Sequence, residues 1–193
     1  MQKNILSILA FFICFSITTS SSACVGRTLY IGALSSTEDK IMSEMLALLI
    51  NERTGTTVQT RYFSSNEELY TALKSTKEEE RVDIFTEDTI DAMIRSNQKP
   101  STDPDQDYLT VKELYDKDLN VIWLNPFGYS NNKDGATSSV NAPLVRRDVL
   151  TNFPLLPRVL NKLAGAITDK AYADLAKDVS AGEKPKNVAK NFL

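Results

Sequence analysis

The chain has 193 residues, with 22 Lys and Arg against 25 Asp and Glu, and it contains no histidine. This length fits one domain, and a mildly acidic chain without a strongly basic run lacks the positive surface that nucleic acid requires. The missing histidine removes the usual general base and the commonest metal ligand, which argues against hydrolytic or zinc chemistry.

The first segment has the pattern of a signal peptide. Lys3 precedes an apolar run that is too short to cross a bilayer, which needs about 20 apolar residues. Ser21 and Ala23 then supply the small-x-small pattern of a cleavage site, so we expect a signal peptide over 1–23. A lipid-anchored form would begin at the same Cys24, although Ser21 stands where a lipobox normally has leucine, and both alternatives stay open.

Residues 24–193 are expected to form a single domain that works in the periplasm or another extracytoplasmic space. The other cysteine, Cys14, leaves with the signal, so no internal disulfide can form and stability must come from core packing. A lipid on Cys24 is the one contact with a membrane that we expect.

Strand and helix patterns alternate through the first half of this domain. Short β-branched or apolar runs predict strands, and apolar residues at helical spacing predict helices. The expected elements are a strand over 28–33, a helix over 35–53 with Ser35 and Glu38 as capping box, a strand over 57–63, a helix capped by Ser65 or Asn66, a strand over 82–85 and a helix to about 97. A βαβαβ order predicts an α/β fold with a mostly parallel open sheet flanked by helices.

The second half is read in the same way. The expected elements are a polar loop over 98–107, a strand over 119–124, an Asn-, Ser- and Gly-rich loop from 125 to 141, a short return strand over 142–146, and helices over 153–164, 169–179 and 186–193. No internal repeat interrupts this order, so one continuous lobe is predicted.

Several segments resemble a known family when they are taken in order. Residues 31–50, IGALSSTEDKIMSEMLALLI, are similar to the opening of substrate-binding proteins of quaternary-amine (glycine betaine, carnitine, choline) ABC importers. Residues 68–75, 111–132 and 141–175 resemble later segments of the same family. The resemblance implies a type II periplasmic-binding-protein fold and a non-enzymatic, exported, solute-binding role in osmoprotectant import. The implied partners are a quaternary-amine small molecule and an ABC permease or other envelope protein, with no cofactor.

One part of the family pattern is missing. Family members leave the first lobe after a strand, build a second α/β lobe and return, whereas here Asn132 runs almost directly into Asn141. The resemblance therefore implies a single lobe with half of a clam-like cleft, which would bind its ligand weakly.

The binding residues expected from the resemblance lie where strands end and helices begin: Ser36, Thr37, Asn66, Asp88, Thr89 and Asn131. Helix N-termini favour anions, so Ser36, Thr37 and Asn66 suit a carboxylate, and Asp88 suits a cation. All of these residue types also serve as plain helix caps. The family's cage tyrosines align with Asp88, Val140 and residues 133–134, so cation–π contacts of about 0.5–2 kcal/mol each are lost.

Other candidate sites have weaker patterns. Asp103, Asp105 and Asp107 have the rhythm of a calcium loop, but Tyr108 stands where glycine is needed. No nucleophile and base pair is apparent, so we expect no catalytic residue and no metal. A different class of function stays open beside solute binding: a ligand-independent interaction or regulatory module derived from the receptor lobe.

Overall fold

Most strands of the computed structural model form where the sequence has its short apolar runs. The structure describes residues 26–131 and 138–193. Within them the strands are β1 (Leu29–Leu34), β2 (Val58–Phe63), β3 (Ile84–Asp88), β4 (Val121–Trp123), β5 (Gly128–Asn131) and β6 (Ser138–Arg146). The expected signal peptide lies outside the described residues.

These strands build one mixed sheet in the order β2-β1-β3-β6-β4, with β5 paired to β6. β1 runs parallel to β2 and β3, whereas β6 runs antiparallel to β3, β4 and β5. Among the described strands β6 is therefore the only one that points the other way. The α/β class with a mostly parallel open sheet is confirmed.

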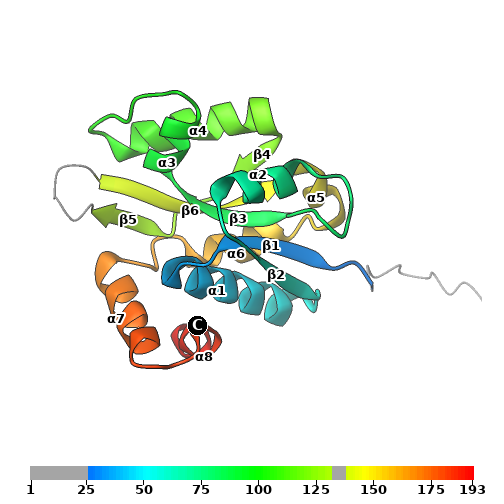
Figure 1. The fold of residues 1–193 in the computed structure, drawn as a ribbon, viewed down its shortest axis with the longest axis vertical. Helices are drawn as coiled ribbons and strands as arrows, with labels where there is room; N and C mark the ends of the chain where they lie inside the picture. Colours follow the sequence, from blue (N-terminus) through cyan, green and yellow to red (C-terminus); the bar gives the residue numbers. More distant parts are fainter. Residues whose placement is uncertain (1–25, 132–137) are drawn as a thin grey trace, which may run out of the picture.

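Helices connect the strands and cover both faces of the sheet. The helical elements are α1 (Thr37–Thr54), α2 (Asn66–Lys74), α3 (Thr89–Arg95), α4 (Pro104–Leu119), α5 (Arg147–Asn152), α6 (Leu156–Leu160), the 3₁₀ turn η2 (Asn161–Leu163), α7 (Asp169–Ser180) and α8 (Pro185–Phe192). Figure 1 shows α3 and α4 on one side of the sheet and α1, α7 and α8 on the other.

A core fills each face, because neighbouring side chains of a strand point to opposite sides. In β3, Ile84 packs into the core shared with α1, α6, α7 and α8, while Phe85 packs into the core shared with α2, α3 and α4. Met45 is fully buried in the first core, and Trp123 is 1% exposed in the second. No helix among the described residues is both long and apolar enough to span a membrane.

The structure corrects several expected boundaries. The side chain that caps α1 belongs to Ser36, which accepts a hydrogen bond from the Asp39 amide at 3.0 Å, and not to Ser35. The expected loop over 98–107 already contains the start of α4 at Pro104, because Asp103 caps that helix. The expected loop from 125 to 141 contains β5 and the first part of β6.

Candidate functional site

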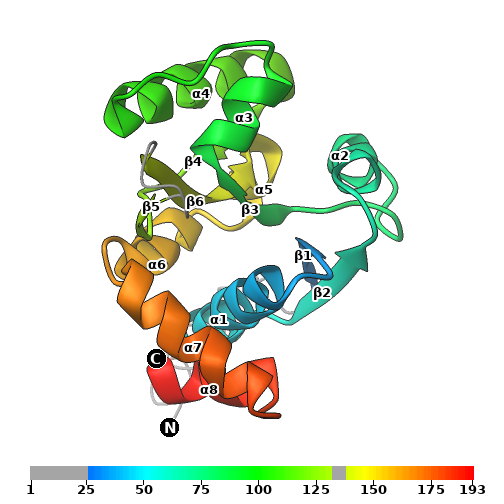
Figure 2. The ribbon, with the colours of Figure 1, turned by 60° about the vertical axis from the view of Figure 1, so that its left-hand side comes forward.

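A cleft opens where the first turns of three helices meet. The volume of this cleft is about 450 Å³. Its lining comes from the ends of β1 and β3, the start of β6 and the first turns of α1, α2 and α3: Gly32, Ala33, Leu34, Glu38, Asp39, Asn66, Leu69, Tyr70, Phe85, Thr86, Glu87, Asp88, Ile90, Asp91, Ser139 and Asn141. Figure 2 shows α1 below, α2 to one side and α3 above this region.

The connections of the sheet explain this location. β1 and β3 are neighbouring parallel strands, but the helix after β1 covers one face and the helix after β3 covers the other. Two neighbouring strands whose following helices part in this way leave a crevice beyond their carboxyl ends. The cleft lies at that crevice.

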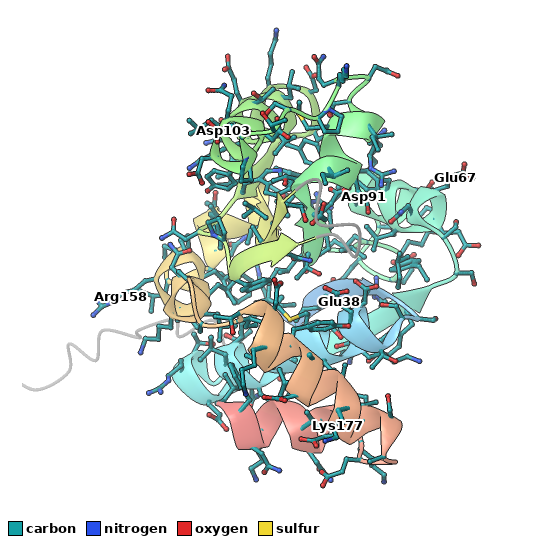
Figure 3. The ribbon with its side chains drawn as sticks, turned by 90° about the vertical axis from the view of Figure 1, so that its left-hand side faces the viewer. Glu38, Glu67, Asp91, Asp103, Arg158 and Lys177 are labelled. Atoms are coloured by element: carbon teal, nitrogen blue, oxygen red, sulfur yellow. The ribbon has the colours of Figure 1, made fainter. Side chains whose placement is uncertain are left out.

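Five acidic residues line the cleft, and one of them, Glu87, forms an ion pair with Arg95, so the other four carboxylates give the cleft its charge. Glu38 and Asp39 come from α1, Asp88 ends β3, and Asp91 lies in the first turn of α3. Figure 3 labels Glu38 and Asp91 on the two helices that border the opening. The lining residues that the structure describes include no lysine or arginine, so the cleft is anionic.

Desolvation makes part of this charge costly to hold without a cation: Asp39 and Asp88 are half-buried, whereas Glu38 and Asp91 are exposed. Desolvation raises the pKa of Glu38, the carboxylates of Asp39 and Asp88 raise it further, and a hydrogen bond from Tyr172 lowers it. Desolvation likewise raises the pKa of Asp39 against the opposing hydrogen bond from Ser36, and Asp91 adds to the rise. The carboxylates therefore interact with one another across the cleft.

Asp88 combines a structural role with its place in the cleft. One carboxylate oxygen accepts the Ile90 amide at 2.8 Å, which caps α3. Burial raises the pKa of Asp88, while hydrogen bonds from Ser139 and from the Ile90 amide oppose that rise. A carboxylate has about four acceptor sites, so Asp88 can face a cation while it keeps its hydrogen bonds from Ser139 and the Ile90 amide.

The structure separates the other expected binding residues. Asn66 lines the cleft from the first turn of α2. Ser36 and Thr37 are exposed at the start of α1 and are not part of the lining. The Thr89 hydroxyl is fully buried and accepts the Val140 amide at 3.0 Å, so it joins α3 to β6 and does not face the cleft. Asn131 lies in β5, where its backbone pairs with Ser138 of β6, and its side chain lies outside the described part.

Besides Glu87, sequence reasoning missed three of these four acids: Glu38, Asp39 and Asp91. Each one lies in the first turn of a helix, where acidic residues ordinarily balance the helix dipole. Their position directly after strands β1 and β3 was the available signal. Only the crossing of α1 and α3 to opposite faces turns three ordinary first-turn acids into one site.

Aromatic side chains contribute little open ring surface here. Tyr70 and Phe85 are the aromatic residues of the lining. The guanidinium of Arg95 already lies 4.3 Å from the Tyr70 ring centre, and the Phe85 ring packs edge-on against Tyr70 at 5.7 Å. Val140, which aligns with a family tyrosine, is 1% exposed. Charge is therefore the feature of the cleft that suits a cation.

The calcium-like acids serve the local structure of α4. Asp103 caps the helix by accepting the Asp105 and Gln106 amides. Asp107 is 2% exposed and accepts the Ser101 amide at 3.0 and 3.1 Å. Among the residues that the structure describes, no group of three or more Asp, Glu or Cys side chains is arranged to hold a metal ion.

Comparisons with solved structures show the fold. A glycine betaine/carnitine/choline ABC transporter structure is 14% identical, with 86% of this chain and 97% of that chain covered and a TM-score of 0.73. Apo YehZ from Escherichia coli is 13% identical, with 87% and 98% covered and a TM-score of 0.74. No match is found among curated proteins.

A family match covers the part of the chain that contains most of the cleft. The substrate binding domain of the ABC-type glycine betaine transport system, the OpuAC family, matches residues 27–139. This is more than half of the chain, and it includes β1, α1, α2, β3 and α3. The chain therefore belongs to the OpuAC family of substrate-binding domains.

Proposed function

We propose that this chain is an extracytoplasmic solute-binding protein of an ABC import system and that its cleft takes a small quaternary-amine cation. The four carboxylates of Glu38, Asp39, Asp88 and Asp91 carry this proposal, because they converge from separate elements on one cleft. At an effective dielectric constant of about 20, one carboxylate about 5 Å from an ammonium contributes roughly 3 kcal/mol before desolvation is subtracted.

The same charge selects among the ligands of this class. Glycine betaine and carnitine carry a carboxylate beside the ammonium group, whereas choline carries a neutral hydroxyl. A ligand carboxylate in this cleft would meet four acids and no lysine or arginine among the described lining residues. We therefore propose that choline binds more tightly than glycine betaine or carnitine.

We also propose that binding is weak, because residues of a single lobe form all the walls of the cleft. Residues 132–137 join β5 to β6 at the point where the family resemblance places a second lobe. A ligand that is held on one side keeps part of its surface in water and loses the affinity that enclosure provides. An ABC permease or another envelope protein is the proposed partner that covers the open side.

Export of the protein is tested by the mass of the mature form. We propose cleavage before Cys24, so intact-mass spectrometry of protein expressed with its own leader should give the mass of residues 24–193. A mass increased by a diacylglycerol and an acyl chain would assign the lipid-anchored form. An unchanged full-length mass would contradict the signal peptide.

Ligand binding is tested by titration of the mature protein with choline, glycine betaine, carnitine and tetramethylammonium. Calorimetry gives the dissociation constants, and ligand at about 100 times its dissociation constant should add about 2.7 kcal/mol to the free energy of unfolding. Choline and tetramethylammonium are expected to bind more tightly than the two zwitterions. Tighter binding of glycine betaine would contradict the charge argument.

Asp88→Asn is the variant that isolates the charge. Asparagine is as good a helix cap as aspartate, so α3 keeps its N-cap while the cleft loses one negative charge. We expect choline affinity to fall about tenfold, which corresponds to about 1.4 kcal/mol. Glu67→Gln is the matched control, since Glu67 is a first-turn acid of α2 that is exposed and absent from the lining.

The alternative function predicts a different result for the same titration. If the lobe is a ligand-independent interaction module, no quaternary amine shifts its stability at millimolar concentration, and Asp88→Asn behaves like Glu67→Gln. That result would contradict solute binding by the isolated chain and favour the ligand-independent interaction module.

A further inference from the structure

A buried hydrogen-bonded group lies directly beneath the cleft. Glu87 of β3 is 8% exposed and lines the floor. Its carboxylate accepts hydrogen bonds from the Tyr70 hydroxyl, from the Tyr115 hydroxyl at 2.8 Å and from Arg95 Nε at 3.1 Å. The two tyrosine hydroxyls also lie 2.8 Å apart.

The three donors come from three different helices. Tyr70 belongs to α2, Arg95 to α3 and Tyr115 to α4, so one carboxylate joins all three to β3. Tyr70 is held at two points: its hydroxyl bonds to Glu87, and its ring lies under the Arg95 guanidinium at 4.3 Å. Because a buried carboxylate needs its donors, this group resists rearrangement.

Tyr70 connects this group to the wall of the cleft. Tyr70, Leu69 and Asn66 are the lining residues that α2 contributes. Figure 2 shows the α2 ribbon standing apart from α3 and α4, on another side of the region in which the cleft lies. The hydrogen bond from the Tyr70 hydroxyl to Glu87 therefore ties this wall to β3, the strand that leads through Asp88 into α3.

We propose that Glu87 is a positioning residue of the binding site, which holds Tyr70 and with it the α2 wall in the geometry that receives the solute. This inference rests on the proposed solute-binding function for its affinity readout. Its mechanical part, the attachment of α2 to Glu87, does not depend on the identity of the ligand. Burial raises the pKa of Glu87 while the bonds from Tyr70, Arg95 and Tyr115 oppose the rise, which agrees with a carboxylate held in place by its donors.

Tyr70→Phe and Tyr115→Phe form a matched pair for the test. Each variant removes one hydroxyl from the same Glu87 oxygen and keeps the aromatic ring in its core, but Tyr70 alone of the two lines the cleft. We expect similar losses of thermal stability. Choline affinity, measured by calorimetry well below both melting temperatures, should fall about tenfold in Tyr70→Phe, the equivalent of one hydrogen bond, and should fall less in Tyr115→Phe, because Tyr115 reaches the cleft wall only through Glu87 and Tyr70.

Amide hydrogen exchange supplies a readout that needs no ligand. Exchange in α2 should be faster in Tyr70→Phe than in the parent protein, while Tyr115→Phe should change the exchange of α2 less. Glu87→Gln keeps an acceptor for the hydroxyls and should retain most of the α2 protection, whereas Glu87→Leu should lose it.

The outcomes distinguish a failure of the positioning role from a failure of the proposed solute-binding function. Equal effects of the two tyrosine variants on α2 exchange would overturn the positioning role and leave the group as general core stabilisation. Faster exchange confined to α2, with no choline binding by the parent protein, would support the attachment and contradict the proposed function instead.

Discussion

At the scale of single residues, Asp83 shows how a buried acid serves the fold and not the site. Asp83 is fully buried between β1 and β3, where it accepts the Tyr30 amide at 3.0 Å and pairs with Arg81 Nε at 3.0 Å. Burial raises its pKa, against the opposing effects of the Tyr30 amide and of Arg81. Holding Asp83 in its charged form therefore costs free energy, and its main contribution to the fold is to accept the hydrogen bond from the Tyr30 amide.

Two substitutions at Asp83 separate its role as a hydrogen-bond acceptor from its charge. Asp83→Ala leaves the Tyr30 amide and Arg81 without their partner, so we expect a loss of about 2–3 kcal/mol in the free energy of unfolding. Asp83→Asn keeps an acceptor and should cost less than half as much. Urea denaturation measures both, with Asp118→Ala on the exposed side of α4 as control. Equal losses for the two variants would show that the ion pair with Arg81 matters most.

At the scale of elements, the hydrophobic pattern predicted most strands and helices but not their ends. Ser35 and Ser36 both stand three residues before an acid, and local chemistry does not distinguish the two caps. β5 and the first part of β6 are rich in Asn, Ser and Gly, so their strand structure depends on pairing with each other. Tertiary pairing overrides the weak propensity of such segments.

Gly128, the first residue of β5, lies so close to another backbone segment that a side chain does not fit there. A β-carbon at Gly128 would overlap the backbone carbonyl oxygen of Ile167, in the segment that leads into α7. Backbone cannot move aside as a flexible side chain can, so Gly128→Ala should destabilise the protein by more than 2 kcal/mol, roughly the upper range of overpacking costs.

Gly55→Ala is the comparison for this prediction. Gly55 ends α1 with φ of 68° and has open space around it, so alanine there meets only backbone strain of about 1–2 kcal/mol. Thermal or urea unfolding should rank Gly128→Ala as the more damaging change. The reverse order would mean that β5 and the α7 segment separate readily.

At the scale of the whole molecule, the cleft gathers charges that are far apart in the chain. Glu38 and Asp39 follow β1, whereas Asp88 and Asp91 follow β3. Their mutual repulsion appears only when the sheet places the two strand ends together. Desolvation is the main cause of the raised pKa values at Glu38, Asp39 and Asp88, and repulsion across the two strand ends adds to it at Glu38, from Asp88, and at Asp39, from Asp91.

These pKa values predict opposite pH dependences for stability and for binding. An acid whose pKa is raised by folding binds its proton more tightly in the folded state, so its contribution to stability falls as pH rises above the ordinary values of 3.8 and 4.5. Acidification through that window should relieve the repulsion in the free protein. Cation binding needs the charged form, so choline affinity should fall over the same window.

Calorimetric titration of choline from about pH 7.5 to about pH 4 checks this prediction. Asp88→Asn should show a flatter dependence because one titrating acid is gone. A choline affinity that does not change with pH would mean that the acids of the cleft stay away from the ligand.

Hydrophobic periodicity and short motifs are local properties of the chain, so the βαβαβ order, the α/β class and the family resemblance could all be predicted from the amino-acid sequence. It also marked Asp88 and Asn66 as cleft residues through their places at helix starts. Tertiary structure alone decided that Thr89 faces β6, that first-turn acids of two helices share one cleft, and that Glu87 joins three helices beneath it. The physical reason is that side chains distant in the chain interact only after the sheet has ordered its strands.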